Sequence, residues 1–321
     1  MKRGLVIGKF MPLHKGHIAL INFAAQQCDE VIVSMSVTTS DSIDGALRFS
    51  WIQEIFQHEA RIKPAMVEDN FDDETLPLPA RTKIWASFIK KRFPPIDLIF
   101  SSEEYGEPFA KNLGAQHITF DRVRKEFPVS ASQIRKHPFQ YWSFIPEKVQ
   151  PYFVKKICFY GPESTGKSSA AKQMAEKYKT TFVPEVAREL ISANDFGLET
   201  IIAIGNAHYD RIQEKLKTAN KILFCDTDAI TTQIYSHHYL SEVPSILYEL
   251  EKKITYDQYF LFDIDVPWIE DGLRDLGHMR KEMFLIFKKA LDKRGINYIL
   301  VSGKGQEREN TITKVVDAML L

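Results

Sequence analysis

The chain has 321 residues, which is more than one hydrophobic core usually organises, and domains of about 150 residues predict two of them. Its apolar content of 44% and charged content of 26% are those of a globular protein. Basic and acidic residues number 42 each, so no general positive field attracts nucleic acid or an acidic membrane surface. No stretch resembles a signal peptide or a membrane span, and the three cysteines lie in or beside apolar runs, which predicts a cytoplasmic protein.

The first half alternates short apolar runs with helical patterns. GLVIG (residues 4–8), EVIVSMSV (30–37) and DLIFSS (97–102) are typical of buried strands. Apolar residues at helical spacing predict helices over residues 16–28, 47–56 and 83–92. Strands that alternate with helices indicate a parallel sheet covered on both faces.

A connector follows at residues 138–152, PFQYWSFIPEKVQPY. Its three prolines block a long regular element, and its five aromatic residues argue against a free linker, so we expect it to pack on a domain. We place the domain boundary near residue 150. The alternation then resumes with KKICFYG, KILFCDTD, QYFLFDID and NYILVSG, separated by helical stretches. The fold class is therefore two α/β domains, residues 1–150 and 151–321.

The most specific motif of the second half is GPESTGKS, residues 161–168. It follows an apolar strand and precedes a helix, as a phosphate-binding loop requires. Gly161 and Gly166 let the backbone curl around phosphate oxygens, Lys167 adds a positive charge, and the Ser168 hydroxyl is a ligand for Mg²⁺. The expected ATP-binding residues also include Glu163, Ser164 and Thr165.

The apolar strand KILFCDTD ends in two acidic residues, Asp226 and Asp228. Asp226 is the candidate for the second magnesium ligand or the catalytic base. Asp228 is a candidate substrate ligand, with capping of the next helix as an equally good explanation. DGLRDLG predicts a lid that places Arg274 over the transferred phosphoryl group.

Glu185 and Arg188 lie one turn apart in PEVARE and are candidates for gripping a substrate, although an ordinary surface ion pair explains them nearly as well. The GTPase motif N-K-x-D is missing from the sequence, and a half of this length suits a kinase for a small metabolite.

In the first half, GKFMPLHKGH places His14 and His17 three residues apart at the start of a helix. Neutral or protonated, both imidazoles can donate to phosphate oxygens, and the helix N-terminus adds backbone N–H groups. Few ligands for zinc lie nearby, which disfavours a metal site. We expect this ATP site to be completed by Gly8, Lys9 and Phe10 at the first strand and by Ser130, Ser132 and Arg135 in VSASQIR.

The strings G-x-F-x-P-x-H-x-G-H and S-x-S-x-I-R resemble the HxGH nucleotidylyltransferases over residues 1 to about 140. Together with SSEEYG, HPFQYWSFIP, GPESTGKS, DTDAITTQ and DGLRDLG, they make the whole chain similar to the NadR family. This resemblance implies that residues 151–321 use ATP and Mg²⁺ to phosphorylate nicotinamide riboside. It also implies that residues 1–150 join the resulting mononucleotide, NMN, to the adenylyl group of a second ATP, giving NAD and pyrophosphate.

A cationic pyridinium favours an aromatic neighbour, and Trp85 and Trp268 are the candidates. The sequence departs from the family at two places. The first strand begins so early that we expect no helix-turn-helix repressor domain, and S-A-S stands where the superfamily often has S-S-T. A bifunctional coenzyme A synthase and a nucleotide-sensing regulator are the alternative functions. The oligomeric state stays open, with a homo-oligomer as one option.

Overall fold

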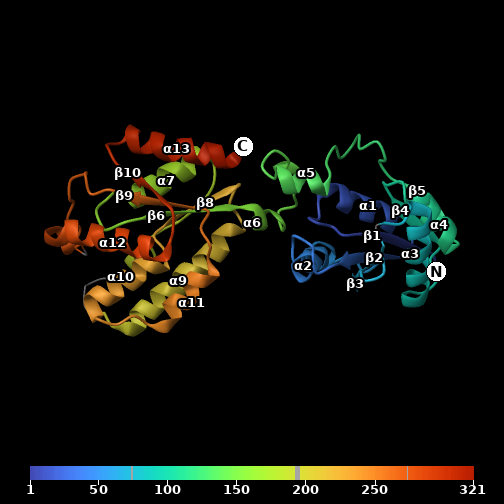
Figure 1. The fold of residues 1–321 in the computed structure, drawn as a ribbon, viewed down its shortest axis with the longest axis horizontal. Coiled ribbons are helices and arrows are strands. Elements are labelled where there is room, and N and C mark those ends of the chain that lie inside the picture. Colours follow the sequence, from blue (N-terminus) through green and yellow to red (C-terminus); the bar gives the residue numbers. More distant parts are fainter. Residues whose placement is uncertain (74, 192–195, 273) are drawn as a thin grey trace. The chain divides into compact units, whose positions relative to one another are not determined.

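A computed structural model describes residues 1–73, 75–191, 196–272 and 274–321. The chain forms two compact units, Met1–Gln150 and Pro151–Leu321, each built around a parallel sheet (Figure 1). Among the described residues, helices that combine the length and the apolar character needed to cross a membrane are absent.

The first unit has a five-stranded parallel sheet in the order β3-β2-β1-β4-β5. Leu5 of β1 and Ile32 of β2 pack against Ala86 and Phe109 of helices α3 and α4, whereas α1 contacts β1, β2 and β4. The strands are β1 (Arg3–Gly8), β2 (Glu30–Val37), β3 (Ile62–Glu68), β4 (Leu98–Ser101) and β5 (Gln116–Thr119). The helices are α1 (Lys15–Ala25), α2 (Gly45–Phe56), α3 (Leu78–Arg92), α4 (Gly106–Leu113) and α5 (Ala131–Lys136).

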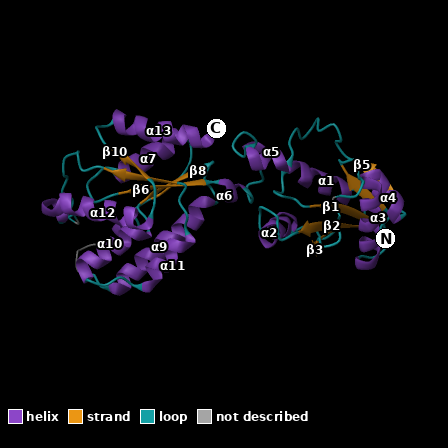
Figure 2. Ribbon diagram, in the orientation of Figure 1, coloured by secondary structure: helices purple, strands orange, loops and turns teal. Residues whose placement is uncertain are grey.

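The second unit has a five-stranded parallel sheet in the order β10-β9-β6-β8-β7, with helices on both faces (Figure 2). Phe159 lies in a core with helices α7 and α13, and its neighbour Tyr160 lies in the opposite core with α10 and α12. The strands are β6 (Lys155–Tyr160), β7 (Phe182–Val183), β8 (Ile222–Asp226), β9 (Gln258–Phe262) and β10 (Tyr298–Val301). The helices are α7 (Lys167–Lys177), α8 (Ala187–Leu190), α9 (Leu198–Leu216), α10 (Ala229–Leu240), α11 (Ser245–Lys253), α12 (Arg280–Arg294) and α13 (Gln306–Leu320).

The predicted connector contains a 3₁₀ helix, η1 (Trp142–Phe144), and the short helix α6 (Gln150–Phe153). Phe139, Ile145 and Val149 are buried, so this segment packs on a folded unit as its aromatic composition indicated.

Strand order fixes where ligands can bind. In an open parallel sheet the crevice lies at the carboxyl ends of the strands, where successive crossover connections leave in opposite directions. Both sheets have such a point beside their first strand, because β1 lies between β2 and β4 and β6 lies between β8 and β9. The residues that follow β1, β4, β6 and β8 are therefore the ones to inspect.

Candidate active sites

The turn after β1 brings the two histidines into contact. His14 is the N-cap of α1, and its Nδ1 accepts the N–H of Gly16 at 3.1 Å. The Nδ1 of His17 accepts the backbone N–H of His14 at 3.4 Å, which completes a capping box. The two rings stack with centroids 3.7 Å apart.

These contacts determine what the imidazoles can do. Burial, reinforced by the charge of Arg124, lowers the pKa of His14 to about 4. Burial also lowers the pKa of His17 well below its usual value, with smaller contributions from His14 and Arg124. Both rings are therefore neutral at pH 7, and of the two protonation states that the sequence allowed, only the neutral one fits. Because each Nδ1 accepts a backbone N–H, each proton is on Nε2, which is the atom that can donate to a ligand.

A cavity of about 950 Å³, its open mouth included, lies in front of these rings. We call it the histidine cavity. Gly8, Phe10, Ser130 and Ser132 line it, so segments more than a hundred residues apart in sequence meet there. Arg124 also lines it and was missed by the sequence reasoning, because VRKEF carries no motif.

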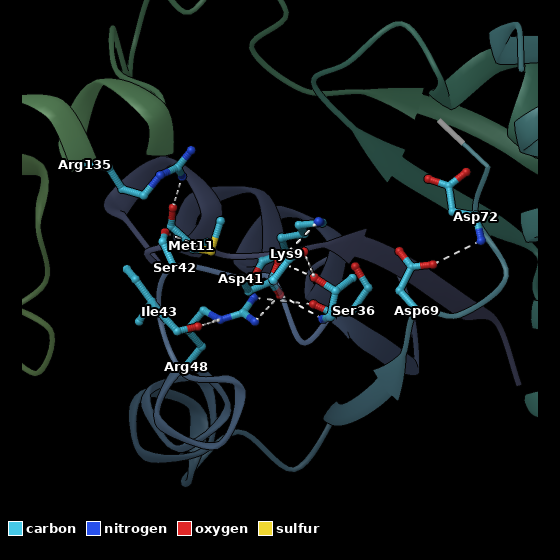
Figure 3. A network of polar contacts seen from close by, with 12 residues as sticks. Lys9, Met11, Ser36, Asp41, Ser42, Ile43, Arg48, Asp69, Asp72 and Arg135 are labelled. Carbon is cyan, nitrogen blue, oxygen red and sulfur yellow. Dashed lines mark hydrogen bonds and ion pairs between the residues drawn. The ribbon is translucent and has the colours of Figure 1, made fainter. Parts of the chain in front are cut away.

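The late string supports the site in two different ways. Ser130 is the N-cap of α5, and its Oγ accepts the N–H of Gln133 at 3.2 Å. The guanidinium of Arg135 donates to the Oγ of Ser132 at 3.1 Å. It also donates to the carbonyl oxygen of Met11, as Figure 3 shows. Arg135 does not line the histidine cavity, so its position favours holding two loops together over direct contact with phosphate.

A second cavity, of about 750 Å³ with its mouth, shares Gly8 and Tyr105 with the first. We call it the tryptophan cavity because Trp85 lines it, edge-on to Tyr105 with ring centroids 5.6 Å apart. Lys9 lines this cavity and not the histidine cavity, since its Nζ lies 3.3 Å from the carboxylate of Asp41. The expectation that Lys9 binds ATP therefore lacks geometric support, whereas Trp85 is placed to contact a ligand beside the end of β1.

A fully buried arginine holds together the segments that follow β1 and β2 (Figure 3). Arg48 of α2 donates to Asp41 Oδ2 at 2.6 Å, to the carbonyl of Ile43 at 3.0 Å and to the carbonyl of Lys9. The Asp41 side chain is only 4% exposed, so the pair is a buried ion pair. Sequence patterning did not identify Arg48, because it sits in an otherwise ordinary helical stretch, ALRFSW.

In the second unit, the loop after β6 has the conformation that its glycines permit. Gly161 has φ +135° beside the backbone of Phe262, and Gly166 has φ +89° as the N-cap of α7. The buried Lys167 Nζ donates to the carbonyl of Pro162 at 2.8 Å, and Thr165 Oγ1 donates to the same carbonyl at 2.9 Å. Lys167 is thus held at the loop, where it can reach phosphate oxygens.

Arg308 of α13 supports the same loop and was also missed from the sequence. Its Nε donates to the carbonyl of Gly303 at 2.8 Å, and Nη1 donates to the carbonyl of Thr165. Its guanidinium also pairs with Asp265 after β9. Arg308 further lines a cavity of about 980 Å³ with its mouth, together with Ser164, Thr165 and Gly166. We call it the donor cavity.

Asp226 ends β8 directly beside β6, paired in register with Phe159. It is completely buried, and neither carboxylate oxygen accepts a well-formed hydrogen bond from the described residues, although Ser168 lies close enough to stabilise the charge. Burial raises the pKa of Asp226 to about 6, and the charge of Lys167 opposes this rise while that of Glu185 adds to it. A buried carboxylate that receives no well-formed hydrogen bond from the described residues is a strong candidate for a cation ligand or a base.

A further cavity, of about 820 Å³ with its mouth, is lined by Glu163 of the loop, and we call it the acceptor cavity. Glu185 and Arg188 line it, with Arg188 Nε 2.8 Å from Glu185 and Nη1 2.8 Å from Asp271. Glu163 also lines this cavity and accepts the N–H of Leu276 at 2.9 Å, so it connects the cavity wall to the segment that was predicted to be a lid. The remaining walls are aliphatic, aromatic and polar, and the aromatic and polar residues include Phe196, His208, Thr227, Thr231, Tyr235 and Tyr239.

Arg274 lines both the donor and the acceptor cavities. Its Nη1 donates to the carbonyl of Ile269 at 2.8 Å, and its Nε lies 3.1 Å from Asp271. Ser164 ties this segment to the phosphate loop, since its Oγ accepts the N–H of Ile269 at 2.8 Å. Arg274, which the sequence predicted as a lid arginine, therefore lies where the donor and acceptor cavities meet.

Two other candidates have structural roles. Asp228 is the N-cap of α10, accepts the N–H and hydroxyl of Thr231 at 2.8 and 2.9 Å, and accepts the hydroxyl of Tyr259 at 3.0 Å. It is absent from the walls of the acceptor cavity, so the capping explanation describes it better than substrate binding. Trp268 lines neither cavity of this unit; it packs on Gly277 and beneath the guanidinium of Arg280.

Comparison with known proteins places these sites in a family. Residues 5–137 match the cytidylyltransferase-like family and residues 156–308 match the AAA domain family. The chain is 33% identical over 328 residues to the trifunctional NAD biosynthesis/regulator protein NadR of Escherichia coli (strain K12), a match that covers 93% of this chain and 78% of that protein. The nicotinamide-nucleotide adenylyltransferase of Thermococcus onnurineus is 28% identical over 159 residues, covering 49% of this chain and 83% of that protein.

A crystal structure of a NadR protein in complex with NR has the same two-unit fold. It matches with a TM-score of 0.81 at 22% identity, covering 100% of this chain and 96% of that one. The predictions of two parallel α/β units and of the family are thereby confirmed. The chain belongs to the NadR family.

Proposed function

We propose that this chain makes NAD in two ATP-dependent steps, phosphorylating nicotinamide riboside in the second unit and adenylylating the resulting NMN in the first. The observation that carries the proposal is that each unit has a cavity beside a candidate phosphate-binding motif, in a chain 33% identical to a NAD biosynthesis protein. Each site lies at the carboxyl ends of a parallel sheet, and each has a neighbouring cavity for a second substrate.

The kinase step uses the donor and acceptor cavities. The 5′-hydroxyl of the riboside attacks the γ-phosphorus of ATP, the bond from γ-phosphorus to the bridging oxygen breaks, and ADP leaves. Asp226 or Glu185 takes the hydroxyl proton, because Asp226 ends β8, Glu185 follows the neighbouring strand β7 and lines the acceptor cavity, and the charge of Glu185 acts on Asp226. Lys167, held at the phosphate loop, and Arg274, which lines both cavities, neutralise charge on the phosphoryl oxygens.

A magnesium ion fits the same place. Asp226 offers two buried oxygens without a well-formed hydrogen bond, and the Ser168 hydroxyl lies beside them. These hard oxygen ligands are those that Mg²⁺ prefers, and it usually takes few protein ligands beside the substrate phosphates. When bound, the ion would neutralise the β- and γ-phosphates of ATP.

The pyridinium ring of the riboside favours aromatic walls. In the acceptor cavity, Tyr235 and Tyr239 stack with centroids 6.3 Å apart, and Phe196 lies edge-on to Tyr239 at 5.4 Å. In the first unit, Trp85 and Tyr105 supply the aromatic wall of the tryptophan cavity. A cation over such rings is stabilised by about 0.5–2 kcal/mol, which supports one nicotinamide site in each unit.

The adenylyl step joins the histidine and tryptophan cavities across Gly8. The phosphate of NMN attacks the α-phosphorus of ATP, the bond between the α-phosphorus and the bridging oxygen breaks, and pyrophosphate leaves. Since the protein forms no covalent bond in this step, positioning and charge neutralisation carry the rate. The Nε2–H groups of His14 and His17 can donate to phosphate oxygens without first gaining a proton.

The test is direct product analysis. The purified chain is incubated with nicotinamide riboside, ATP and Mg²⁺, and NMN and NAD are followed by mass spectrometry. We expect both, with NMN appearing first. Absence of both products contradicts the proposal, and NMN without NAD would restrict it to the kinase.

A further inference from the structure

The histidine cavity lacks positive charge where the sequence suggested it. Polyphosphate carries several negative charges and needs cationic or N–H donors. His14 and His17 are neutral at pH 7 because burial lowers the pKa of each ring. Lys9 lines the tryptophan cavity beside Asp41, and Arg135 is turned toward the carbonyl of Met11.

One cation remains. Among the described residues that line the histidine cavity, Arg124 is the only arginine or lysine. It lines the cavity together with both imidazole rings, and its charge contributes to lowering the pKa of each ring. Phosphate bound between them would meet the neutral donors of His14 and His17 and the planar, permanently charged fork of Arg124.

The loop that carries Arg124 is wound around one carboxylate. Asp121 accepts the backbone N–H groups of Lys125 at 2.8 Å, Glu126 at 3.2 Å and Phe127 at 3.1 Å. The N–H of Arg124 donates to the carbonyl of Asp121 at 2.8 Å. Asp121 and Arg124 both have positive φ, +37° and +52°, a conformation that costs energy for residues with a Cβ. The backbone at Arg124 is therefore fixed by its own loop, at the wall of the cavity.

The side chain has one backbone partner and one exchangeable partner. Arg124 Nη1 donates to the carbonyl of Val129 at 3.3 Å, whereas Nη2 lies 2.8 Å from Glu103, and the side chains of Arg124 and Glu103 are 40% and 54% exposed. Exposed ion pairs contribute little to stability, so a polyphosphate can displace Glu103. Glu103 follows β4 and also lines the histidine cavity, so exchange requires only rotation of side chains within one site.

We infer that Arg124 binds the pyrophosphate portion of ATP in the adenylyl step, exchanging its ion pair with Glu103 for the β- and γ-phosphates. This inference rests on the proposed adenylyl transfer. When NMN attacks the α-phosphorus, the electron pair of the breaking bond passes to the bridging oxygen of pyrophosphate. Arg124 then neutralises the charge that develops on that leaving group.

The test compares Arg124→Gln, Arg124→Lys and Glu103→Gln in the full chain. For Arg124→Gln we expect adenylyl transfer to lose about 100-fold in kcat/KM for ATP, and inhibition by pyrophosphate to weaken at least about tenfold. Arg124→Lys should lose less of this kcat/KM, because lysine keeps the positive charge and lacks only the planar guanidinium with its paired donors. Glu103→Gln should bind pyrophosphate a few-fold more tightly, since the competing carboxylate is gone. The KM for NMN and the kinase activity should stay within about twofold in all three.

If Arg124 were merely structural, its variants would impair kcat and the KM values for both ATP and NMN in the adenylyl step. Glu103→Gln would then bind pyrophosphate no more tightly than the unmodified chain. Unchanged pyrophosphate inhibition in Arg124→Gln, or a change in the KM for NMN alone, overturns the inference. If the unmodified chain makes no NAD, the proposed function fails instead. Calorimetric titration of pyrophosphate into the unmodified chain and Arg124→Gln still decides the role of Arg124 in that case: weaker binding by the variant supports it and equal binding overturns it.

Discussion

Replacing Lys167 by methionine should separate the two activities. The Lys167 side chain is only 7% exposed, and its described hydrogen bond is to the carbonyl of Pro162 at 2.8 Å. Its charge acts on Asp226, whose pKa it holds down against the effect of burial. Methionine preserves most of the length and apolar packing of the chain while removing the charge that the phosphates would meet.

The expected loss of kinase activity in Lys167→Met follows from the burial of the Lys167 side chain. Removing one partner of a desolvated charge–phosphate contact costs about 3–5 kcal/mol, which corresponds to roughly 10²- to 10⁴-fold in kcat/KM for the kinase step. Adenylyl transfer from supplied NMN should stay within about twofold, because Lys167 lies in the Pro151–Leu321 unit and His14 and His17 lie in the Met1–Gln150 unit.

The assay supplies either nicotinamide riboside or NMN with ATP and Mg²⁺ and measures NMN and NAD separately. His17→Ala is the matched control, and it should lose NAD formation while it continues to make NMN. A Lys167→Met chain that loses both activities, or keeps kinase activity within about tenfold of the unmodified chain, would refute the assignment of the two sites.

Three more outcomes follow from charges and burial. Kinase kcat/KM should fall as pH drops through about 6, because protonated Asp226 can neither bind Mg²⁺ nor take the proton of the substrate hydroxyl. Asp226→Asn should be inactive at every pH. A flat pH profile of the unmodified chain down to pH 5 would exclude Asp226 as the magnesium ligand or base. Because the pKa of His14 is lowered to about 4, the unfolded chain takes up a proton first, so acidification from about pH 6.5 to 4 should cost up to about 3 kcal/mol of stability; urea titrations should show a smaller loss for His14→Asn, which keeps the N-cap. Arg48→Met should destabilise the first unit by about 3–5 kcal/mol in thermal unfolding, because it leaves Asp41 buried without its cation, and adding Asp41→Asn should recover part of that loss.

Much of the fold was predictable because the central strands are unmistakable. The runs that became β1, β2, β4, β6, β8 and β9 are continuous and apolar, as strands covered on both faces must be. The sequence reasoning did not identify β3, β5 or β7, and all three flank the central strands as outer or short elements. In β3, Lys63 and Pro64 interrupt the apolar pattern, which an edge strand tolerates and a central strand does not.

The sites divide in the same way. The sequence by itself determined the phosphate loop at residues 161–168 and the pair His14 and His17, because glycine conformations and helix caps are local and the motif carries its own geometry. It also indicated that Asp226 ends a strand, and the parallel register with β6 brings that residue to the loop.

Only the tertiary structure decided which charges reach which cavity. It turned Lys9 toward Asp41, used Asp228 as a helix cap, and brought Arg124 to the histidine cavity and Arg308 to the donor cavity from segments that carry no motif. These assignments depend on side-chain partners far away in the sequence, and a long flexible arginine or lysine can serve several of them. Packing and ion pairing select one partner after the chain has folded, and no pattern of neighbouring residues encodes that choice.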